Sequence, residues 1–545
     1  MDQVLSKISL FYNKKWIEPF FVSLLVLVFI SLSIYSSSQE NIVNDETVHI
    51  PAGITYVKTH DIQMNSEHPP LVKYLSGLSA EIFVDPQINQ SSFSWTFTEQ
   101  WGFGRNTMFK DNDHERLTFW SRMPVIFLSA ALALAIFFWA RIMFGKAVAL
   151  SALMFFCLDP TMIAYSHLVT FDLPATTFIA FSGLFLYLAI KKNRYWNFLL
   201  SGAMLGLALS SKASALAFIP VIAVILLIEA YRKKIKIATL TTSLLKQSSL
   251  IAAGCFSAIW AVYLLVQRST AFKNAELVPQ SFIESMEFGF DRYGVDKSSY
   301  IAGTFYETGQ RWFLPFSFLL KSPLPLLLML ILGIIFLFVR SHRSKDLNLY
   351  ILFPIIFLGA VACYSTLNWG IRYLFMIYPF IYIFAAYASV RLVRTFKMSQ
   401  VLIPIFAIYY IFTLVNFFPS YIPYINELGG GKNNGYKVFA GSNVDWGQGQ
   451  KLLKSYIEDN NLPSPTIAYW REGGTLYYSS VYNFESISIR GRGSDAIARL
   501  TDTKGILAVS TYLANNIGLN GVGYKINGQK PFAVISGSWL LYNFE

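Results

Sequence analysis

The chain has 545 residues, of which 54% are hydrophobic and only 14% are charged. Because soluble domains carry about 25% charged residues, this composition excludes a wholly soluble protein and predicts that much of the chain lies in a membrane. The formal net charge is +12, but the basic residues gather in short clusters between apolar segments, as membrane topology predicts. With no basic-aromatic motif beside them, these clusters argue against nucleic-acid binding.

The first long apolar segment covers residues 17–38 and follows Lys7, Lys14 and Lys15. Its apolar core of roughly 18 residues is longer than that of a signal peptide, so we predict an uncleaved helix with its N-terminus in the cytoplasm. Ten further segments have spanning length, at about 118–140, 147–165, 170–190, 196–212, 214–231, 248–268, 313–339, 349–366, 371–390 and 399–419. The positions of the basic clusters agree with a polytopic α-helical protein of about eleven transmembrane helices, whose C-terminus lies outside the cytoplasm.

Three regions then face outward, at residues 39–117, 269–312 and about 420–545. The first contains the apolar stretches IPAGITYV and LVKYLSGLSAEIFV. Both are too short to span a bilayer, and they predict helices that lie in or along the membrane interface.

The tail differs sharply in composition from the rest of the chain. GGGKNNG at 429–435 is typical of a flexible connection. Beyond it, YKVFA, TIAYW, GILAVS and PFAVIS predict strands, and GQKLLKSYIEDN predicts an amphipathic helix. We therefore predict two domains, a transmembrane domain over 1–419 and a small external α/β domain over 420–545.

Titratable residues cluster directly after the first helix, within the stretch 44–71. Carboxylates beside a membrane often mark sites or proton pathways. The pair Asp45-Glu46 is a candidate general base for transfer to a hydroxyl, or alternatively Asn44 or Asp45 caps the following helix. His49 falls one helical turn after Asp45, so the two would share a face; alternatively it is a structural histidine.

A second motif is Glu67-His68-Pro69-Pro70-Leu71. The two prolines alone indicate a rigid turn that begins a helix. They do not account for the acid and the histidine that precede them. Glu67 is a candidate for orienting an acceptor or holding a cation, and His68 for contacting a phosphate.

The stretch DETVHIPAGITYVKTHDIQMNSEHPPL resembles the first external loop of the dolichyl-phosphate-mannose protein mannosyltransferase family. More broadly, it resembles bacterial GT-C glycosyltransferases of that type, which include the aminoarabinose transferases that act on lipid A. The resemblance implies that Asp45 is the catalytic aspartate and Glu46 its neighbouring acid. It also implies that Glu67 is the acid of the second motif and that His68 lies near the donor phosphate.

The resemblance continues through three later motifs. HLVTFDLPATTF is similar to a family segment that places Asp172 at the outer membrane face, although Asp172 is also a candidate helix cap. SKASALAFIP gives Lys212 an outward-facing position. NWGIRYLFMIYPF is similar to the Gly-x-Arg-Tyr motif of the family, with Arg372 as a phosphate ligand and Tyr373 beside the sugar. Arginine suits this role because its guanidinium offers fixed bidentate donors.

Four further residues are weaker candidates. Lys321, in ETGQRWFLPFSFLLKSPLPLLL, either meets a lipid phosphate or extends its amine toward the membrane surface. Arg122, in Ser-Arg-Met-Pro, is a second phosphate candidate. SNVDWGQGQKLLKSY resembles the family segment that begins the soluble tail, where Asp445 and Trp446 either contact sugar or form a structural turn.

Together these likenesses imply a GT-C glycosyltransferase of a bacterial inner membrane, with a polyprenyl-phosphate sugar donor and a protein, lipid or glycan acceptor. They imply an inverting displacement at the outer face, with Asp45 as the base. Metal use varies among relatives, and Glu67 and Asp172 are the candidates for holding a divalent cation. The alternatives are a transporter or a non-catalytic glycan-binding membrane protein. A transporter should have inverted repeats or broken helices that carry charges at mid-membrane, and the sequence indicates neither.

Overall fold

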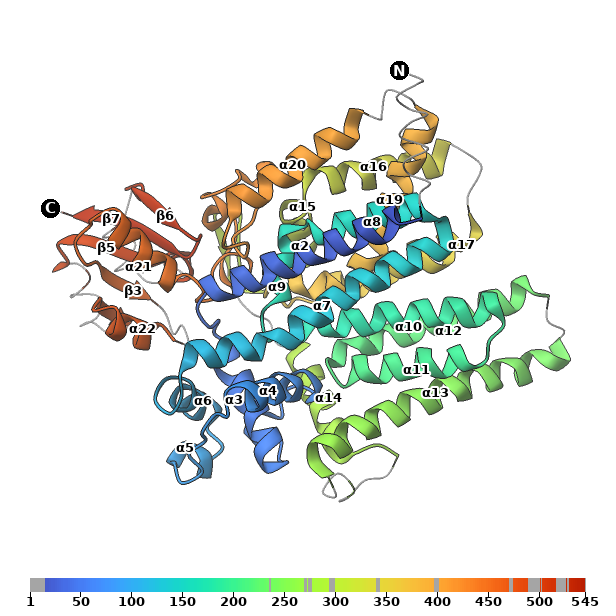
Figure 1. The fold of residues 1–545 in the computed structure, drawn as a ribbon, viewed down its shortest axis with the longest axis horizontal. Helices are drawn as coiled ribbons and strands as arrows, with labels where there is room; N and C mark the ends of the chain where they lie inside the picture. The colour runs from blue at the N-terminus through green and yellow to red at the C-terminus, as the bar shows by residue number, and fades with distance from the viewer. Residues whose placement is uncertain are drawn as a thin grey trace.

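The structure is a computed structural model, and it describes residues 15–234, 237–268, 272, 277–293, 299–339, 344–396, 401–469, 474–488, 500, 502–515, 526 and 529–544. Long helices form a bundle, and a mixed sheet lies beyond one end of it (Figure 1). Within these ranges seven helices are long and apolar enough to cross a membrane, or nine if each of two bent pairs counts as one span. This is a multi-pass membrane protein.

The seven spans are α2 (Ile17–Gln39), α7 (His114–Phe144), α10 (Asp172–Lys192), η2 with α12 (Ala213–Arg232), α13 (Ile237–Gln267), α17 to α18 (Lys345–Tyr364), and η5 with α19 (Ile371–Thr395). The other two of the eleven predicted spans coincide with the shorter apolar helices α11 (Trp196–Leu209) and α20 (Leu402–Phe417). Length and composition alone therefore support fewer spans than the sequence predicted.

Two spans are broken, which the sequence analysis did not predict. Helices α8 (Lys146–Cys157) and α9 (Pro160–Ser166) meet at 63°, and α15 (Phe313–Lys321) and α16 (Leu324–Val339) meet at 115°. The first break has a local cause, because Asp159 caps α9 by accepting a hydrogen bond from Thr161 N at 2.8 Å and Pro160 occupies the first helical position.

The short helix α11 lies against both α10 and α13 (Figure 1). Glycines permit this close approach: a Cβ on Gly202 would lie 1.9 Å from the carbonyl oxygen of Ile251, and one on Gly206 would lie 2.4 Å from that of Cys255. Small residues at such positions let helix backbones pack tightly in a membrane. Packing therefore holds α11 in the bundle despite its length.

The predicted external loop forms η1 (Gln63–Asn65) and the helices α3 (Glu46–Thr59), α4 (Leu71–Phe83), α5 (Phe93–Thr96) and α6 (Gln100–Phe109). Helices α3 and α4 cross at Gly53 and Gly77, where a Cβ on Gly53 would lie 2.0 Å from the carbonyl oxygen of Lys73. Eleven of the fourteen residues of α3 are buried. Helix α3 is therefore enclosed by protein, unlike the interfacial helix that its sequence predicted.

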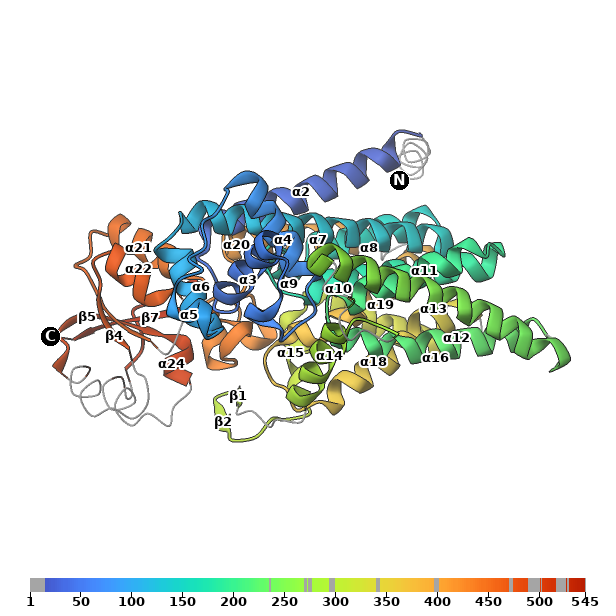
Figure 2. The same cartoon turned by 90° about the horizontal axis from the view of Figure 1, so that it is seen from below.

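The tail contains a five-stranded sheet, seen beyond the end of the bundle in Figure 2. Its order is β4-β3-β5-β7-β6, with β3 parallel to β4 and β5, and β7 antiparallel to β5 and β6. The strands are β3 (Thr466–Tyr469), β4 (Glu485–Ser488), β5 (Gly505–Ser510), β6 (Ala533–Ile535) and β7 (Trp539–Phe544), and the helices are α21 (Gln450–Asp459), α22 (Thr475–Val481) and α24 (Thr511–Asn515). Two successive residues of β5, Ala508 and Val509, point to opposite faces of the sheet and join separate apolar clusters, so both faces of the sheet are covered.

The predicted strands TIAYW, GILAVS and PFAVIS and the predicted helix of the tail are confirmed, apart from Trp470, which lies outside the described residues. YKVFA was wrongly predicted as a strand. It begins with the 3₁₀ turn η8 (Gly435–Lys437), and Phe439 N donates to the Gly435 carbonyl at 2.9 Å. Its only strand-like pairing among the described residues is a single bridge to Ile301, because the backbone has already turned.

Candidate functional site

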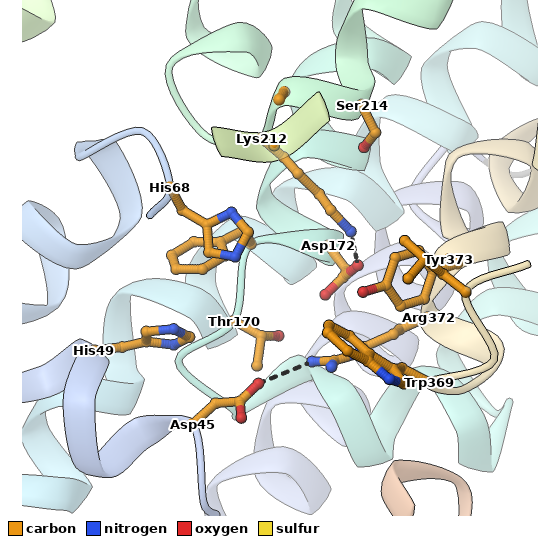
Figure 3. A pocket seen from close by; sticks show the side chains of 14 residues that line it. Asp45, His49, His68, Thr170, Asp172, Lys212, Ser214, Trp369, Arg372 and Tyr373 are labelled. Carbon is orange, nitrogen blue, oxygen red and sulfur yellow. Dashed lines mark hydrogen bonds and ion pairs between the residues drawn. The ribbon is translucent and has the colours of Figure 1, made fainter. Parts of the chain in front are cut away.

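A cavity opens where the predicted external loop meets the helix bundle (Figure 3). Its walls come from the start of α3, the turn before α4, the segment before α10, η2, the helix α14 (Gln280–Tyr293) and the segment entering η5. The lining residues are Asp45, His49, His68, Thr170, Phe171, Asp172, Lys212, Ala213, Ser214, Gly289, Leu367, Trp369, Arg372 and Tyr373. Segments far apart in the chain thus converge on one polar cavity.

Two ion pairs lie in this cavity (Figure 3). Arg372 Nη1 donates to Asp45 Oδ2 at 3.3 Å, and Lys212 Nζ donates to Asp172 Oδ1. The Asp45 side chain is 30% exposed, so solvent or a ligand can reach it. The cavity therefore presents two carboxylates and two cations side by side.

Neither carboxylate is used to cap a helix. Asp45 occupies the N-cap position of α3, but its side chain makes no capping hydrogen bond. Helix α10 begins at Asp172 itself, with Phe171 at the N-cap. The capping alternatives left open by the sequence therefore do not apply to these two side chains.

Three rings form one wall of the cavity. Phe171 lies between His49 and His68, with centroid separations of 4.5 Å to each imidazole. His49 Nδ1 lies 2.9 Å from the carbonyl oxygen of Val169; since a carbonyl only accepts, Nδ1 carries a proton. Burial lowers the pKa of His49 below its usual 6.5, so this imidazole is neutral near pH 7.

Aromatic rings also support both cations. The Arg372 guanidinium lies 4.2 Å from the centroid of the Trp446 ring, and Lys212 Nζ lies 4.5 Å from that of Tyr373. Such contacts favour a cation electrostatically, by about 0.5–2 kcal/mol according to how far it is desolvated. The two cations are thus oriented before any ligand binds.

Glu46 and Arg122 lie outside the cavity lining and bind each other. Arg122 donates to Glu46 through Nε at 2.9 Å and Nη2 at 2.6 Å, and both side chains are 0% exposed. Glu46 also accepts hydrogen bonds from Val43 N at 3.0 Å and Val169 N at 2.8 Å. All these partners are internal, so the geometry supports a structural role here in place of the catalytic and phosphate-binding roles predicted.

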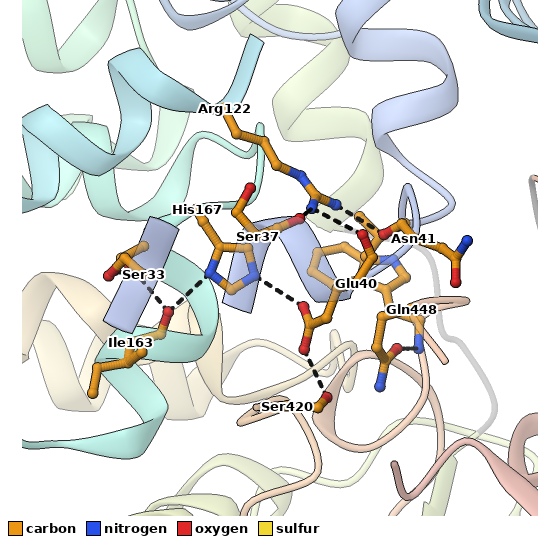
Figure 4. Close-up of polar contacts among 12 residues, drawn as sticks. Ser33, Ser37, Glu40, Asn41, Arg122, Ile163, His167, Ser420 and Gln448 are labelled. Carbon is orange, nitrogen blue, oxygen red and sulfur yellow. Dashed lines mark hydrogen bonds and ion pairs between the residues drawn. The ribbon is translucent and has the colours of Figure 1, made fainter. Parts of the chain in front are cut away.

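A second buried polar pair lies beside Arg122 (Figure 4). His167 Nε2 lies 2.9 Å from Glu40 Oε2, and Ser420 Oγ donates to Glu40 Oε1 at 2.6 Å. The remaining imidazole nitrogen of His167 lies 3.2 Å from the Ile163 carbonyl oxygen. The sequence analysis did not single out Glu40 or His167, although a charged residue directly after the first span was an available signal.

Glu67 and Lys321 also lie outside the cavity lining. Glu67 accepts a hydrogen bond from Gln100 Nε2 at 2.7 Å. Lys321 is 1% exposed, and its Nζ donates to the carbonyl oxygens of Ile422 at 2.6 Å and Asn443 at 2.7 Å. Lys321 therefore joins α15 to the start of the tail instead of meeting a phosphate.

Asp445 and Trp446 lie behind the cavity wall. Asp445 is 3% exposed and accepts hydrogen bonds from Thr511 Oγ1 and Tyr512 N, both at 3.3 Å. Trp446 is 8% exposed and faces Arg372. The structure thus favours the structural alternative for these two residues over direct sugar contact.

The sequence analysis missed part of the lining. Thr170, Phe171, Ser214 and Trp369 all lie within a few residues of predicted site residues. Only their proximity in sequence to the predicted site residues could have identified them, because none of these side chains titrates near neutral pH.

Residues 116–260 match the sequence profile of the family described as dolichyl-phosphate-mannose-protein mannosyltransferase. This match covers 145 of the 545 residues, and it identifies the protein as a membrane glycosyltransferase of the type that depends on a sugar linked to a lipid phosphate. The matched segment runs from α7 into α13 and includes Asp172 and Lys212. A sequence comparison with curated proteins gave no match.

The whole chain resembles a solved structure in fold. The crystal structure of ArnT from Cupriavidus metallidurans in the apo state is 12% identical, with a TM-score of 0.51 over 96% of this chain and 97% of that one. ArnT bound to undecaprenyl phosphate is 13% identical, with a TM-score of 0.49 over 97% and 98%. The S. cerevisiae protein O-mannosyltransferase Pmt1-Pmt2 complex bound to the sugar donor is 20% identical over 46% and 33%, with a TM-score of 0.34. The apo ArnT match identifies a GT-C-like fold.

Each of the two broken spans carries a buried titratable side chain. Broken helices that carry charges are a feature expected of a transporter. Asp159 accepts a hydrogen bond from Tyr382 at 2.7 Å beside the break between α8 and α9, and Lys321 ends α15. Both side chains bind internal partners, and the family match favours an enzyme over a transporter.

The candidate metal ligands are occupied by protein groups. Glu67 binds Gln100, and Asp172 pairs with Lys212. In the part of the chain that the structure describes, no three His, Cys, Asp or Glu side chains gather as metal ligands would.

Proposed function

We propose that the enzyme moves a sugar from a polyprenyl phosphate to an acceptor hydroxyl at the outer face of the membrane, with inversion at C1. The acceptor is a protein, a lipid or a glycan, and Asp45 is the general base. The observation that carries this proposal is the cavity in which Asp45 and Asp172 face Arg372 and Lys212. A base and a cationic leaving-group site within one cavity are what a single displacement requires.

The acceptor oxygen attacks C1 of the sugar as Asp45 takes its proton. The bond from C1 to the phosphate oxygen breaks, and its electron pair leaves with the polyprenyl phosphate. Arg372 and Lys212 stabilise the negative charge that develops on that phosphate.

The two ion pairs suggest how donor binding prepares the base. Arg372 donates to Asp45 Oδ2 at 3.3 Å, so this carboxylate is engaged by the cation. An incoming phosphate competes for Arg372, because guanidinium binds phosphate through paired charge-assisted hydrogen bonds. Donor binding would thus release Asp45 when the acceptor needs it. Lys212 would move from Asp172 to the phosphate in the same way, leaving Asp172 to bind a sugar hydroxyl.

The remaining cavity residues suit the neutral parts of the substrates. Aromatic faces favour the apolar faces of sugar rings, and Phe171, Trp369 and Tyr373 all line the cavity. His49 and His68 flank Phe171. With its proton on Nδ1, His49 presents Nε2 as an acceptor for a sugar hydroxyl, and His68 is the histidine assigned to the phosphate. We place this site outside the cytoplasm in a bacterial inner membrane, with the sheet domain on the same side.

The test compares wild type with Asp45→Asn in the full-length protein reconstituted in lipid. Release of polyprenyl phosphate from a panel of polyprenyl-phosphate-linked hexoses is followed with peptide, lipid and glycan acceptors. Removal of a general base typically costs 10²–10⁴-fold in rate, so we expect turnover to fall by that order. Polyprenyl-phosphate binding and the melting temperature should persist.

Asp111→Asn is the matched control. It makes the same chemical change in the same predicted external loop, at an exposed side chain outside the cavity lining. It should leave turnover unchanged. Wild-type turnover in Asp45→Asn would overturn the assignment of the base, and a wild-type protein that binds no polyprenyl phosphate would overturn the donor.

A further inference from the structure

The loop of residues 445–448 connects the cavity to the sheet domain. Its backbone accepts two hydrogen bonds from the segment that leads into Asp45: Asn41 N donates to Gln448 O at 3.1 Å, and Asn44 N donates to Trp446 O at 3.0 Å. The peptide directly before the candidate base is therefore held by the tail of the chain.

The same loop also holds the candidate phosphate ligand. The Trp446 ring lies 4.2 Å from the Arg372 guanidinium and packs at 6.1 Å from the ring of Tyr165. Trp446 is only 8% exposed and does not line the cavity. Its ring therefore supports Arg372 from behind and offers no open face for a sugar.

Internal hydrogen bonds make the loop rigid. Trp446 N donates to Gln448 Oε1 at 2.7 Å, and Gln448 Nε2 donates to Val444 O at 2.9 Å. Asp445 accepts from Thr511 Oγ1 and Tyr512 N in α24, which directly follows β5. A displacement of the central strand of the sheet would thus be transmitted to the loop.

We propose that Trp446 is a positioning residue, through which the C-terminal sheet domain sets the place of Arg372 relative to Asp45. Trp446 acts on Arg372 and touches neither the donor nor the acceptor. The inference rests on the proposed function in one respect, the role of Arg372 as a ligand of the lipid phosphate. It gives the sheet domain a part in catalysis without a substrate contact of its own.

The test is a double-mutant cycle in the full-length protein in lipid, using polyprenyl phosphate itself as the binding probe. Trp446→Leu removes the ring that faces Arg372, and we expect binding to weaken by about 10-fold, the order of a desolvated cation–π contact. Trp446→Phe keeps a smaller ring and should retain most of the affinity, and it keeps the test open if Trp446→Leu fails to fold. In an Arg372→Lys background, Trp446→Leu should weaken binding by less than it does in wild type, because an ammonium group lacks the planar face that the guanidinium presents to the ring.

The matched control is Trp139→Leu. Trp139 is an indole in α7 that is 1% exposed, packs on Phe380 at 5.5 Å and lies outside the cavity lining. Its replacement should lower the melting temperature and leave polyprenyl-phosphate affinity unchanged. This separates the loss of a buried ring from the loss of the Arg372 contact.

Two results would overturn the inference alone. One is wild-type affinity in Trp446→Leu while Arg372→Lys is impaired, and the other is an equal loss of affinity in both backgrounds. If Arg372→Lys binds polyprenyl phosphate as wild type does, the proposed role of Arg372 fails and this inference fails with it, whereas the role of Asp45 is decided separately by Asp45→Asn.

Discussion

Asp45 and Glu46 are neighbours in the chain and lie in opposite environments. Asp45 is 30% exposed in a cavity, with one ion pair at 3.3 Å. Glu46 is 0% exposed and accepts four hydrogen bonds at 2.6–3.0 Å, two from Arg122 and two from backbone amides. The difference arises because α3 begins between them, so successive side chains leave the backbone in different directions.

This contrast extends to the regions around the two residues. In the cavity, the carboxylate of each ion pair has partners that a ligand can replace. In the buried cluster of Glu40, Glu46, Arg122 and His167, both side chains of each pair are 0% exposed. Figure 4 shows the contact between Glu40 and His167. Ion pairs whose partners a ligand can replace are suited to catalysis, whereas fully buried pairs are suited to holding the site in shape. A carboxylate beside a membrane can serve either purpose.

The strongest test of this contrast is Glu46→Gln. Removing one member of a buried ion pair leaves the other charge without compensation and costs about 3–5 kcal/mol. We therefore expect a large fall in melting temperature and in the yield of folded protein, measured by thermal unfolding in lipid or detergent. Asp45→Asn should change stability by about 1 kcal/mol or less, because partly exposed pairs contribute little.

The opposite pattern would reverse the roles of the two acids. If Glu46→Gln keeps the wild-type melting temperature and donor binding but loses turnover, Glu46 takes part in the chemistry, as the family resemblance implied. Arg122→Met tests the structural role of Glu46 independently, because it removes the other member of the same buried ion pair.

A smaller effect is expected for Lys212→Gln in the cavity. A hydrogen bond to a charged group contributes about 1.5–3 kcal/mol, so polyprenyl-phosphate affinity should fall by about 10–100-fold. The melting temperature should also fall, because Asp172, whose side chain is 5% exposed, loses its ion-pair partner. Binding is measured with the reconstituted protein. Lys110→Gln, at an exposed position in the predicted external loop, controls for the loss of one positive charge. Equal affinities in wild type and Lys212→Gln would remove Lys212 from the phosphate site.

The sequence motifs predicted much of the cavity. Seven of the thirteen predicted site residues line it: Asp45, His49, His68, Asp172, Lys212, Arg372 and Tyr373. The motifs place a residue near the right end of a helix, but they do not specify the direction of its side chain. That direction depends on where α3 and η5 begin and on distant partners such as Arg122, which lies 76 residues from Glu46.

The fold was predictable to a similar extent. Long apolar segments and strong alternation identified most spans and three strands of the sheet. The bends in α8–α9 and α15–α16 were missed, because each depends on a short proline-containing break inside an otherwise continuous apolar segment. The stretch YKVFA alternates as a strand would, but its backbone is already committed to a turn after Gly435.

The smallest predicted effect concerns the two buried histidines. His49 lines the cavity, and its pKa lies below 6.5 because burial disfavours the charged imidazolium. The unfolded chain therefore binds a proton more readily, so the stability contributed by neutral His49 is complete above about pH 6.5 and is lost as the pH falls toward the lower folded pKa. His167, in contrast, lies within hydrogen-bond distance of Glu40 Oε2 and of the Ile163 carbonyl through its two ring nitrogens, so its replacement removes two buried contacts. We expect His49→Gln to lose less thermal stability than wild type between pH 7.5 and 5.5, and we expect His167→Gln to be destabilised at both pH values. Each unit by which the pKa of His49 is lowered corresponds to about 1.4 kcal/mol, so melting curves at the two pH values resolve the difference. A wild-type protein that gains stability on acidification relative to His49→Gln would contradict a neutral His49 in the cavity wall.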